Sequence, residues 1–149
     1  MRPGTEPDYL RLNDLLWRYR RAVDRYVFLL EVQLMVVEVG RADWLPPVTD
    51  LFDELADRLT QVEREWRTVL GPSVCSLAAL AAAATEPWPG IIIEHRDRLQ
   101  DALREANDLR QRNRQAISAI TAGLGRLFDA VGARIPAPGS GRSTVEQGA

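Results

Sequence analysis

Apolar residues recur every three or four positions along most of the chain, which is the spacing of one side of an α-helix. The first such stretch follows Pro7 and Asp8 and runs without glycine or proline as far as Gly40. Asp8 can cap the start of a helix, and Gly40 is suited to its end. Residues 30–34 also alternate apolar and polar residues, so a strand is the alternative there. The apolar positions of the predicted helix are Leu12, Leu16, Tyr19, Val23, Tyr26, Leu30 and Val37, and Arg18, Arg21 and Arg25 lie on a different, solvated side.

A second helix is predicted after the joint at residues 44–47, because Pro47 suits a first helical turn. Its apolar residues follow steps of four and three, the heptad spacing of helices that pack in pairs, and Gly71 ends it. A short alanine-rich helix follows over residues 77–84. Trp88 follows this short helix between two prolines, and its side chain is expected to cover one end of the helical core. The heptad positions of the second helix are Val48, Phe52, Leu55, Leu59, Val62, Trp66 and Val69.

The last predicted helix, from about residue 91 to residue 131, is the longest. Its length exceeds that of its predicted neighbours, so we expect one end to extend beyond them. After Gly132 the composition changes to proline, glycine, serine and threonine, which is typical of disorder. The predicted seam of this helix consists of Leu99, Leu103, Ala106, Arg110, Asn113, Ile117, Ile120, Leu124, Leu127 and Val131.

These patterns predict an all-α fold, an elongated antiparallel helical bundle or coiled coil of three long helices and one short helix. We expect one helical domain over residues 8–131. Residues 1–7 and 132–149 are expected to be a disordered N-terminus and a disordered tail.

Composition narrows the classes of partner. The 149 residues include 19 basic and 21 acidic side chains, with a net charge of -2, which argues against nucleic acid or an anionic membrane as the main partner. The arginines of the last helix are interleaved with acids, as on a solvated helix face. The most apolar stretch, residues 27–39, is too short and too polar to span a bilayer, and the polar N-terminus does not look like a signal peptide. We therefore expect a soluble protein.

The sequence offers little for catalysis. His95 is the single histidine and is expected to be exposed near the start of the last helix. Glu94 directly precedes His95, so the Glu-x-x-His spacing of di-iron bundles is missing, and Cys75 is the one cysteine. The glycines stand at predicted helix ends and in the tail, not in a phosphate-binding loop. We expect neither an enzyme nor a protein that binds a metal or cofactor.

Two features of the last helix point instead to protein binding. Asn113 interrupts the apolar seam, and a buried asparagine fixes register and partner choice at the expense of stability. The apolar stripe that follows (Ile117, Ile120, Leu124, Leu127, Phe128 and Val131) has no evident cover if the helix extends beyond its neighbours. Such a stripe suits a partner helix, and the alternative is that it packs back on the first helix.

The order of several short motifs resembles the FlgN-type flagellar export chaperones of actinobacteria. Residues 15–21 (LLWRYRR), 28–34 (FLLEVQL) and 40–45 (GRADWL) are similar to the family's start, centre and joint. Residues 103–107 (LREAN) and 112–117 (RNRQAI) are similar to its last helix. The resemblance covers roughly residues 10 to 131 and lies in the order and spacing of the motifs.

The resemblance implies a cytoplasmic chaperone for the hook-associated proteins at the hook–filament junction. Such a chaperone binds the C-terminal helical segment of its client, prevents premature assembly and delivers the client to the export gate of the flagellar type III apparatus. It uses neither nucleotide nor metal. The family's client-binding region is the last helix, which corresponds here to Asn113, Ile117, Ile120, Leu124, Leu127 and Phe128.

Two other interpretations stay open. Heptad spacing alone does not identify a partner, so the chain also fits a generic coiled-coil adaptor or a self-assembling protein. Trp88-Pro89-Gly90 matches the W-x-G turn of secreted helical hairpins of the WXG type. Against the WXG type stand the long helix at the start of the chain and the apparent absence of a Y-x-x-x-D/E export signal after the last helix.

Overall fold

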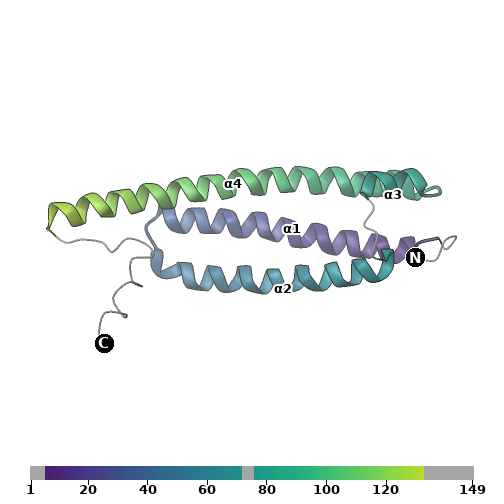
Figure 1. Ribbon diagram of the computed structural model, residues 1–149, viewed down its shortest axis with the longest axis horizontal. Coiled ribbons are helices and arrows are strands. Elements are labelled where there is room, and N and C mark those ends of the chain that lie inside the picture. The colour runs from purple at the N-terminus through teal and green to yellow at the C-terminus, as the bar shows by residue number, and fades with distance from the viewer. Residues whose placement is uncertain (1–5, 72–75, 133–149) are drawn as a thin grey trace, which may run out of the picture. The chain divides into compact units, whose positions relative to one another are not determined.

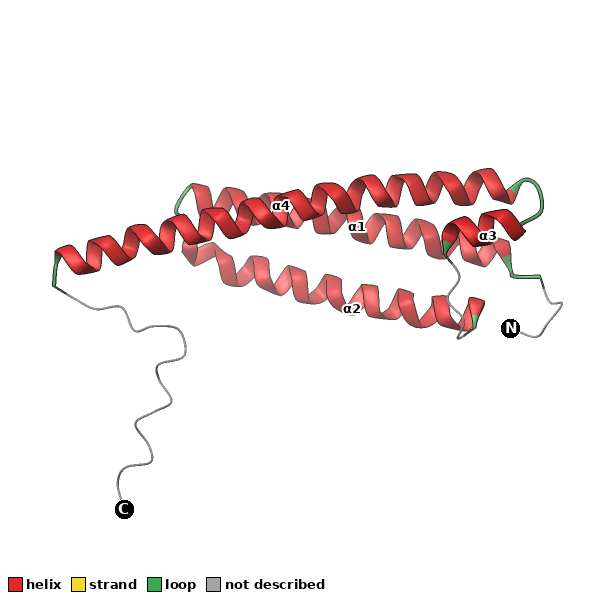
Figure 2. Cartoon of the chain, turned by 45° about the horizontal axis from the view of Figure 1, so that its top comes forward, coloured by secondary structure: helices red, strands yellow, loops and turns green. Residues whose placement is uncertain are grey.

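The computed structural model describes residues 6–71 and 76–132. Every regular element in these residues is helical (Figures 1 and 2), which confirms the all-α prediction. Residues 30–34, where a strand was the alternative, are helical and belong to α1. The helices are α1 (Tyr9–Glu38), the short 3₁₀ helix η1 (Ala42–Trp44), α2 (Leu45–Leu70), α3 (Leu77–Ala83) and α4 (Trp88–Ala130).

Helix ends follow the capping residues in the sequence. The Asp8 carboxylate accepts a hydrogen bond from the Arg11 backbone N–H at the start of α1, and the Ser76 hydroxyl accepts one from Ala79 at the start of α3. Gly40 and Gly71 follow α1 and α2 with φ values of +74° and +77°. Glycine adopts these values without the steric penalty of a side chain, so both helices stop where the sequence predicts.

Helix α4 begins earlier than predicted. Trp88 is its first residue, and Pro89 lies in its first turn, where a missing N–H is tolerated. The Trp88 ring stacks on Tyr9 with 5.6 Å between ring centroids and 17° between ring planes. The half-buried Trp88 side chain packs against the core beside Tyr9, as the sequence predicts.

The chain divides into two parts, residues 6–113 and residues 114–132, which are described separately. In the first part, α1 lies between α2 and the beginning of α4 (Figure 1). Arg18 of α1 contacts Glu65, and Tyr26 contacts Phe52. Higher residue numbers on α1 therefore meet lower numbers on α2, so these two helices are antiparallel, as predicted.

The pairing of α1 with α4 has the opposite sense. Asn13, near the start of α1, contacts His95, whereas Leu30 contacts Asn113 much farther along α4. Residue numbers rise together on the two helices, so α1 and α4 run parallel. The predicted antiparallel order holds for the consecutive helices α1 and α2, and a parallel α1–α4 pair is what an up-and-down order of three long helices requires.

The core of residues 6–113 draws on all four α-helices. One cluster joins the start of α1 to the end of α2, to α3 and to the start of α4, and it contains Tyr9, Leu12, Leu16, Val23, Leu70, Leu80, Ala81, Ile92 and Leu99. A second cluster joins Ala22 and Leu29 of α1 to Leu55 of α2. Each predicted heptad position of α2, from Val48 to Val69, is buried or half-buried.

Within residues 88–113, the predicted seam of α4 is wrong at two positions. Leu103 and Arg110 are exposed, whereas Ala102 is half-buried and Leu109 is buried. After Leu99 a step of three and a step of four both fit a helix, and the prediction took the step to the larger apolar side chain. The observed inward positions are Ile92, His95, Leu99, Ala102, Ala106, Leu109 and Asn113, in regular steps of three and four.

The predicted tail lies outside the described residues except for Gly132, and Met1 to Thr5 of the predicted N-terminus also lie outside them. Glu6 is described and accepts a hydrogen bond from the Thr85 hydroxyl at 3.0 Å. None of the described helices combines the length and the apolar character that crossing a membrane requires.

Candidate protein-binding surface

Four large apolar side chains share one side of α4 within residues 114–132. Ile117, Ile120, Leu124 and Leu127 follow steps of three, four and three, which place them along one helix face about 15 Å long. Each side chain is between 44% and 57% exposed. We call these four residues the C-terminal stripe. Isolated exposed leucines are common on protein surfaces, but a contiguous row of this kind is typical of a surface that another helix covers.

Phe128, the sixth predicted client-binding residue, belongs to α4. Its side chain lies outside the described part of the structure.

Asn113 has a different environment from the C-terminal stripe. Its side chain is only 4% exposed, and Nδ2 donates a hydrogen bond of 3.1 Å to the backbone carbonyl of Leu30. The amide oxygen Oδ1 is buried and has no hydrogen-bond partner among the described residues. Asn113 therefore holds α4 against α1 and is not on the exposed surface that the four apolar residues form.

His95 is buried, contrary to the prediction that it is exposed. Its side chain is 2% exposed and lies between α4 and α1. Arg20 donates to Nδ1 at 3.2 Å, and the Asn13 amide oxygen is 2.8 Å from Nε2. Because arginine can only donate, Nδ1 must accept, and Nε2 carries the proton that is donated to Asn13. The error arose because His95 falls on the inward 3–4 series of α4, which the prediction began only at Leu99.

Burial, with the positive charge of Arg20, lowers the pKa of His95, and Glu94 opposes this shift. The ring is therefore neutral at pH 7. Trp17 meets it edge to face with 5.1 Å between centroids, and the Arg20 guanidinium lies 4.2 Å from the centroid of the Trp17 ring. With both nitrogens engaged and the ring enclosed, His95 orients α4 on α1 and is not placed to transfer a proton to a ligand.

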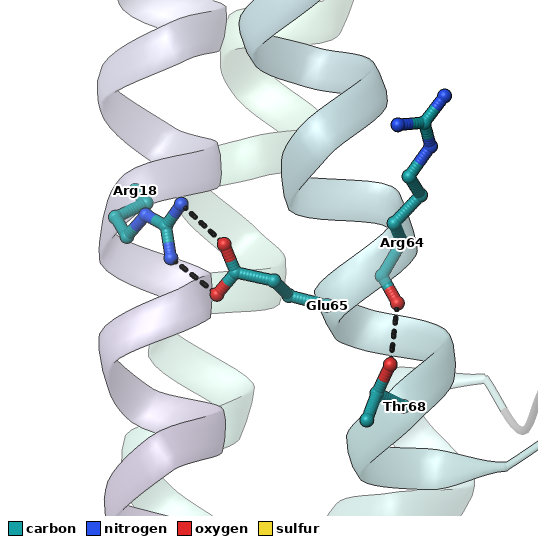
Figure 3. A network of polar contacts seen from close by, with 4 residues as sticks. All are labelled: Arg18, Arg64, Glu65 and Thr68. Carbon is teal, nitrogen blue, oxygen red and sulfur yellow. Dashed lines mark hydrogen bonds and ion pairs between the residues drawn. The ribbon is translucent and has the colours of Figure 1, made fainter.

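An ion pair joins α1 to α2, away from the contacts of His95. The Arg18 guanidinium donates two hydrogen bonds to the Glu65 carboxylate, at 2.7 and 2.9 Å (Figure 3). The hydrogen bonds from Arg18 lower the pKa of Glu65. Arg64, one residue earlier on α2, points away from this pair, and its backbone carbonyl accepts the Thr68 hydroxyl (Figure 3).

Within the described chain, no three or more histidine, cysteine, aspartate or glutamate side chains come together in a way that suits a metal ion. Trp88-Pro89-Gly90, which suggested the turn of a WXG-type hairpin, lies inside the first turn of α4. The helix before it, α3, has only seven residues. The geometry that this alternative requires, a turn between two long helices, is therefore not found at Trp88.

Comparison of the chain with family models, curated proteins and solved structures gives no match.

Proposed function

We propose that this chain is an export chaperone of the FlgN type that binds a helical segment of a client protein on the C-terminal stripe. The exposed row of Ile117, Ile120, Leu124 and Leu127 supports a binding surface on the last helix most directly. The motif order described above supports the client class, which is the hook-associated proteins of the hook–filament junction. Delivery of the client to the flagellar export gate and a cytoplasmic location belong to the same proposal.

The stripe suits an amphipathic client helix. Four partly exposed side chains over about 15 Å match the i, i+3, i+4 and i+7 anchors of a helix laid along them. Full burial of a leucine-sized side chain contributes about 1.5–3 kcal/mol, so completing the burial of four half-exposed ones contributes roughly 3–6 kcal/mol. The client's own anchors add a comparable amount, and the entropy lost on association subtracts from the sum. Micromolar binding is the expected order of affinity.

Asn113 has a supporting role in this proposal. By bonding to the Leu30 carbonyl, it fixes the register of α4 on α1 immediately before the stripe begins. We therefore assign client contact to the C-terminal stripe and positioning of α4 to Asn113.

The test is co-purification of the full chain with the hook-associated proteins of its own organism. Ile120→Asp and Leu124→Asp place a charge within the stripe. Ala122→Asp places the same charge on the opposite side of the same helix, where the native side chain is also exposed, and serves as the matched control.

The proposal predicts a complex that survives Ala122→Asp and is lost in both stripe variants, while helicity by circular dichroism is unchanged. Absence of a complex with every hook-associated protein would remove the flagellar assignment. Light scattering tests the alternative occupant of the stripe, which is a second copy of this chain. A dimer of the wild-type chain that Leu124→Asp dissociates would favour self-assembly over client binding.

A further inference from the structure

A groove between α1 and α2 is lined by four arginines. Arg18, Arg21 and Arg25 come from α1 and Arg58 comes from α2, and the groove has a volume of about 430 Å³. Its remaining lining consists of Gln61 and the apolar side chains Ala22, Leu55 and Val62. We call it the arginine groove. It lies within residues 6–113 and is separate from the C-terminal stripe, so it goes beyond the function proposed above.

The charge of the arginine groove is largely uncompensated. Glu65 neutralises Arg18 through the two hydrogen bonds already described. Among the described residues, no ion pair within 4.0 Å involves Arg21, Arg25 or Arg58. Three guanidinium groups thus face one groove, although acidic side chains are available nearby on the same two helices (Asp14, Asp24, Glu54 and Asp57).

The spacing of two of these arginines is unfavourable in the free protein. Arg21 and Arg25 are four residues apart on one helix, and like charges at this spacing destabilise a helix by about 0.2–0.5 kcal/mol. A carboxylate placed between the arginines removes that repulsion and accepts charge-assisted hydrogen bonds from planar donors suited to it. The energetics therefore favour occupation of the groove by an anionic group.

We propose that the arginine groove binds an acidic segment of a partner protein, with glutamate or aspartate carboxylates placed among Arg21, Arg25 and Arg58. Two features favour a polypeptide over other anions. The first is the apolar lining from Ala22, Leu55 and Val62, which suits the aliphatic part of a glutamate or a neighbouring apolar side chain.

The second feature is the surface that continues along α1. Beyond Arg25, on the same side of the helix, stand Phe28 and Met35, which are 57% and 63% exposed. A segment that carries acidic residues over one turn or two and apolar residues over the next two turns complements both surfaces at once. An amphipathic client or partner helix has this chemistry.

The dimensions argue against a long polyanion. Arg18 and Arg25 are seven residues apart, which corresponds to about 10 Å along the helix. A short acidic stretch fits within this length, whereas nucleic acid requires a longer basic track.

The test uses the full chain and a labelled helical peptide of roughly 16 residues, about 24 Å in length. One half of the peptide carries glutamates and the other half carries leucines at helical spacing, and the halves are made in both orders. A matched peptide has glutamine in place of each glutamate. Fluorescence anisotropy measures binding, with a single-stranded oligonucleotide and inorganic phosphate as competitors.

The protein variants are Arg21→Gln, Arg25→Gln and Arg58→Gln, alone and together. Arg64→Gln on α2 is the matched control, because Arg64 points away from the Arg18–Glu65 pair and does not line the groove (Figure 3). Each single variant is expected to weaken binding of the glutamate peptide about tenfold, since each removes a charge-assisted contact. Arg64→Gln and the stripe variant Leu124→Asp are expected to leave binding unchanged.

Three outcomes overturn the proposal: equal binding of the glutamine peptide, unchanged binding by the triple variant, or an oligonucleotide that binds more tightly than the peptide. Equal loss in Arg64→Gln overturns it as well, because a general charge effect would then explain binding. A steep decrease in affinity between about 50 and 300 mM salt, confined to the glutamate peptide, is the remaining expected result.

Discussion

Replacing Asn113 with leucine is expected to stabilise the protein, although it removes a buried hydrogen bond. Asn113 places one satisfied and one unsatisfied polar atom between α4 and α1: Nδ2 donates to the Leu30 carbonyl, and Oδ1 is buried without a partner among the described residues. The Leu30 carbonyl lies inside α1 and keeps the hydrogen bond that helix geometry gives it from four residues onward. Leucine has the branching of asparagine and leaves no new donor or acceptor unpaired.

The magnitude follows from three contributions. Removing the unsatisfied Oδ1 relieves about 1–3 kcal/mol of desolvation, and losing the Nδ2 hydrogen bond costs about 0.5–1.5 kcal/mol. Burying two methyl groups in place of polar atoms contributes roughly 1.5 kcal/mol more. The free energy of unfolding should therefore rise by about 2 kcal/mol. The urea midpoint should rise by about 1 M, because slopes for small proteins are about 1–3 kcal/mol per M.

The assay is urea unfolding followed by tryptophan fluorescence. All four tryptophans lie between Trp17 and Trp88, so the signal reports residues 6–113. Asn107→Leu is the matched control, because Asn107 is exposed on the same helix and its replacement should change stability by less than about 0.5 kcal/mol. Destabilisation by Asn113→Leu of 1 kcal/mol or more, with Asn107→Leu neutral, would refute the reasoning and show that Oδ1 is well satisfied.

Three further predictions concern the contacts of α1. A double-mutant cycle between Arg18→Gln and Glu65→Gln should give a favourable coupling that decreases as salt is added, because both side chains are about one-third exposed; a coupling of zero at low salt would contradict the bidentate pair (Figure 3). The pKa of His95 is lowered in the folded state, so the unfolded chain binds more protons below its ordinary pKa of 6.5; stability present at pH 7 should fall as the pH drops to 5, and His95→Gln should flatten this dependence in urea titrations at each pH. Leu29→Ala should cost about 2–5 kcal/mol, whereas Phe28→Ala at the exposed neighbouring position should cost less than about 1 kcal/mol; equal costs in thermal unfolding would contradict the observed packing.

The sequence was sufficient to predict the helices because local signals mark most of their ends. Asp8, Gly40 and Gly71 act through contacts within a few residues, and the structure uses each as expected. The start of α4 at Trp88 was missed because proline tolerates both a closing turn and a first helical turn. Local pattern does not separate these two uses.

Features that depend on neighbouring helices were harder to predict. The inward side of α4 was displaced by one position at Leu103 and Arg110, because steps of three and four are equivalent until a partner helix selects one. His95 was expected at the surface, since its burial depends on Asn13 and Arg20 of a helix far away in sequence. A histidine three residues after Ile92 and four before Leu99 is on the apolar side, and that spacing is the signal that could have located it.

Of the two candidate surfaces, one follows from the local sequence pattern and the other depends on a neighbouring helix. Periodicity identified the row from Ile117 to Leu127, and the structure reports each of these four side chains as exposed. The arginines at positions 18, 21 and 25 were expected on a solvated face, but the groove also requires Arg58 of α2. Only the antiparallel packing of α1 and α2 brings that residue beside them, so the sequence alone contained no direct signal for the groove.

Hydrogen exchange measured by mass spectrometry tests the central claim most directly. The full chain is compared alone and with the C-terminal helical segment of a hook-associated protein from its own organism. The account predicts that the segment slows exchange over residues 117–127 and that Leu124→Asp abolishes this protection while Ala122→Asp retains it. Protection confined to α1 and α2, or no protection anywhere in the chain, would contradict client binding on the last helix.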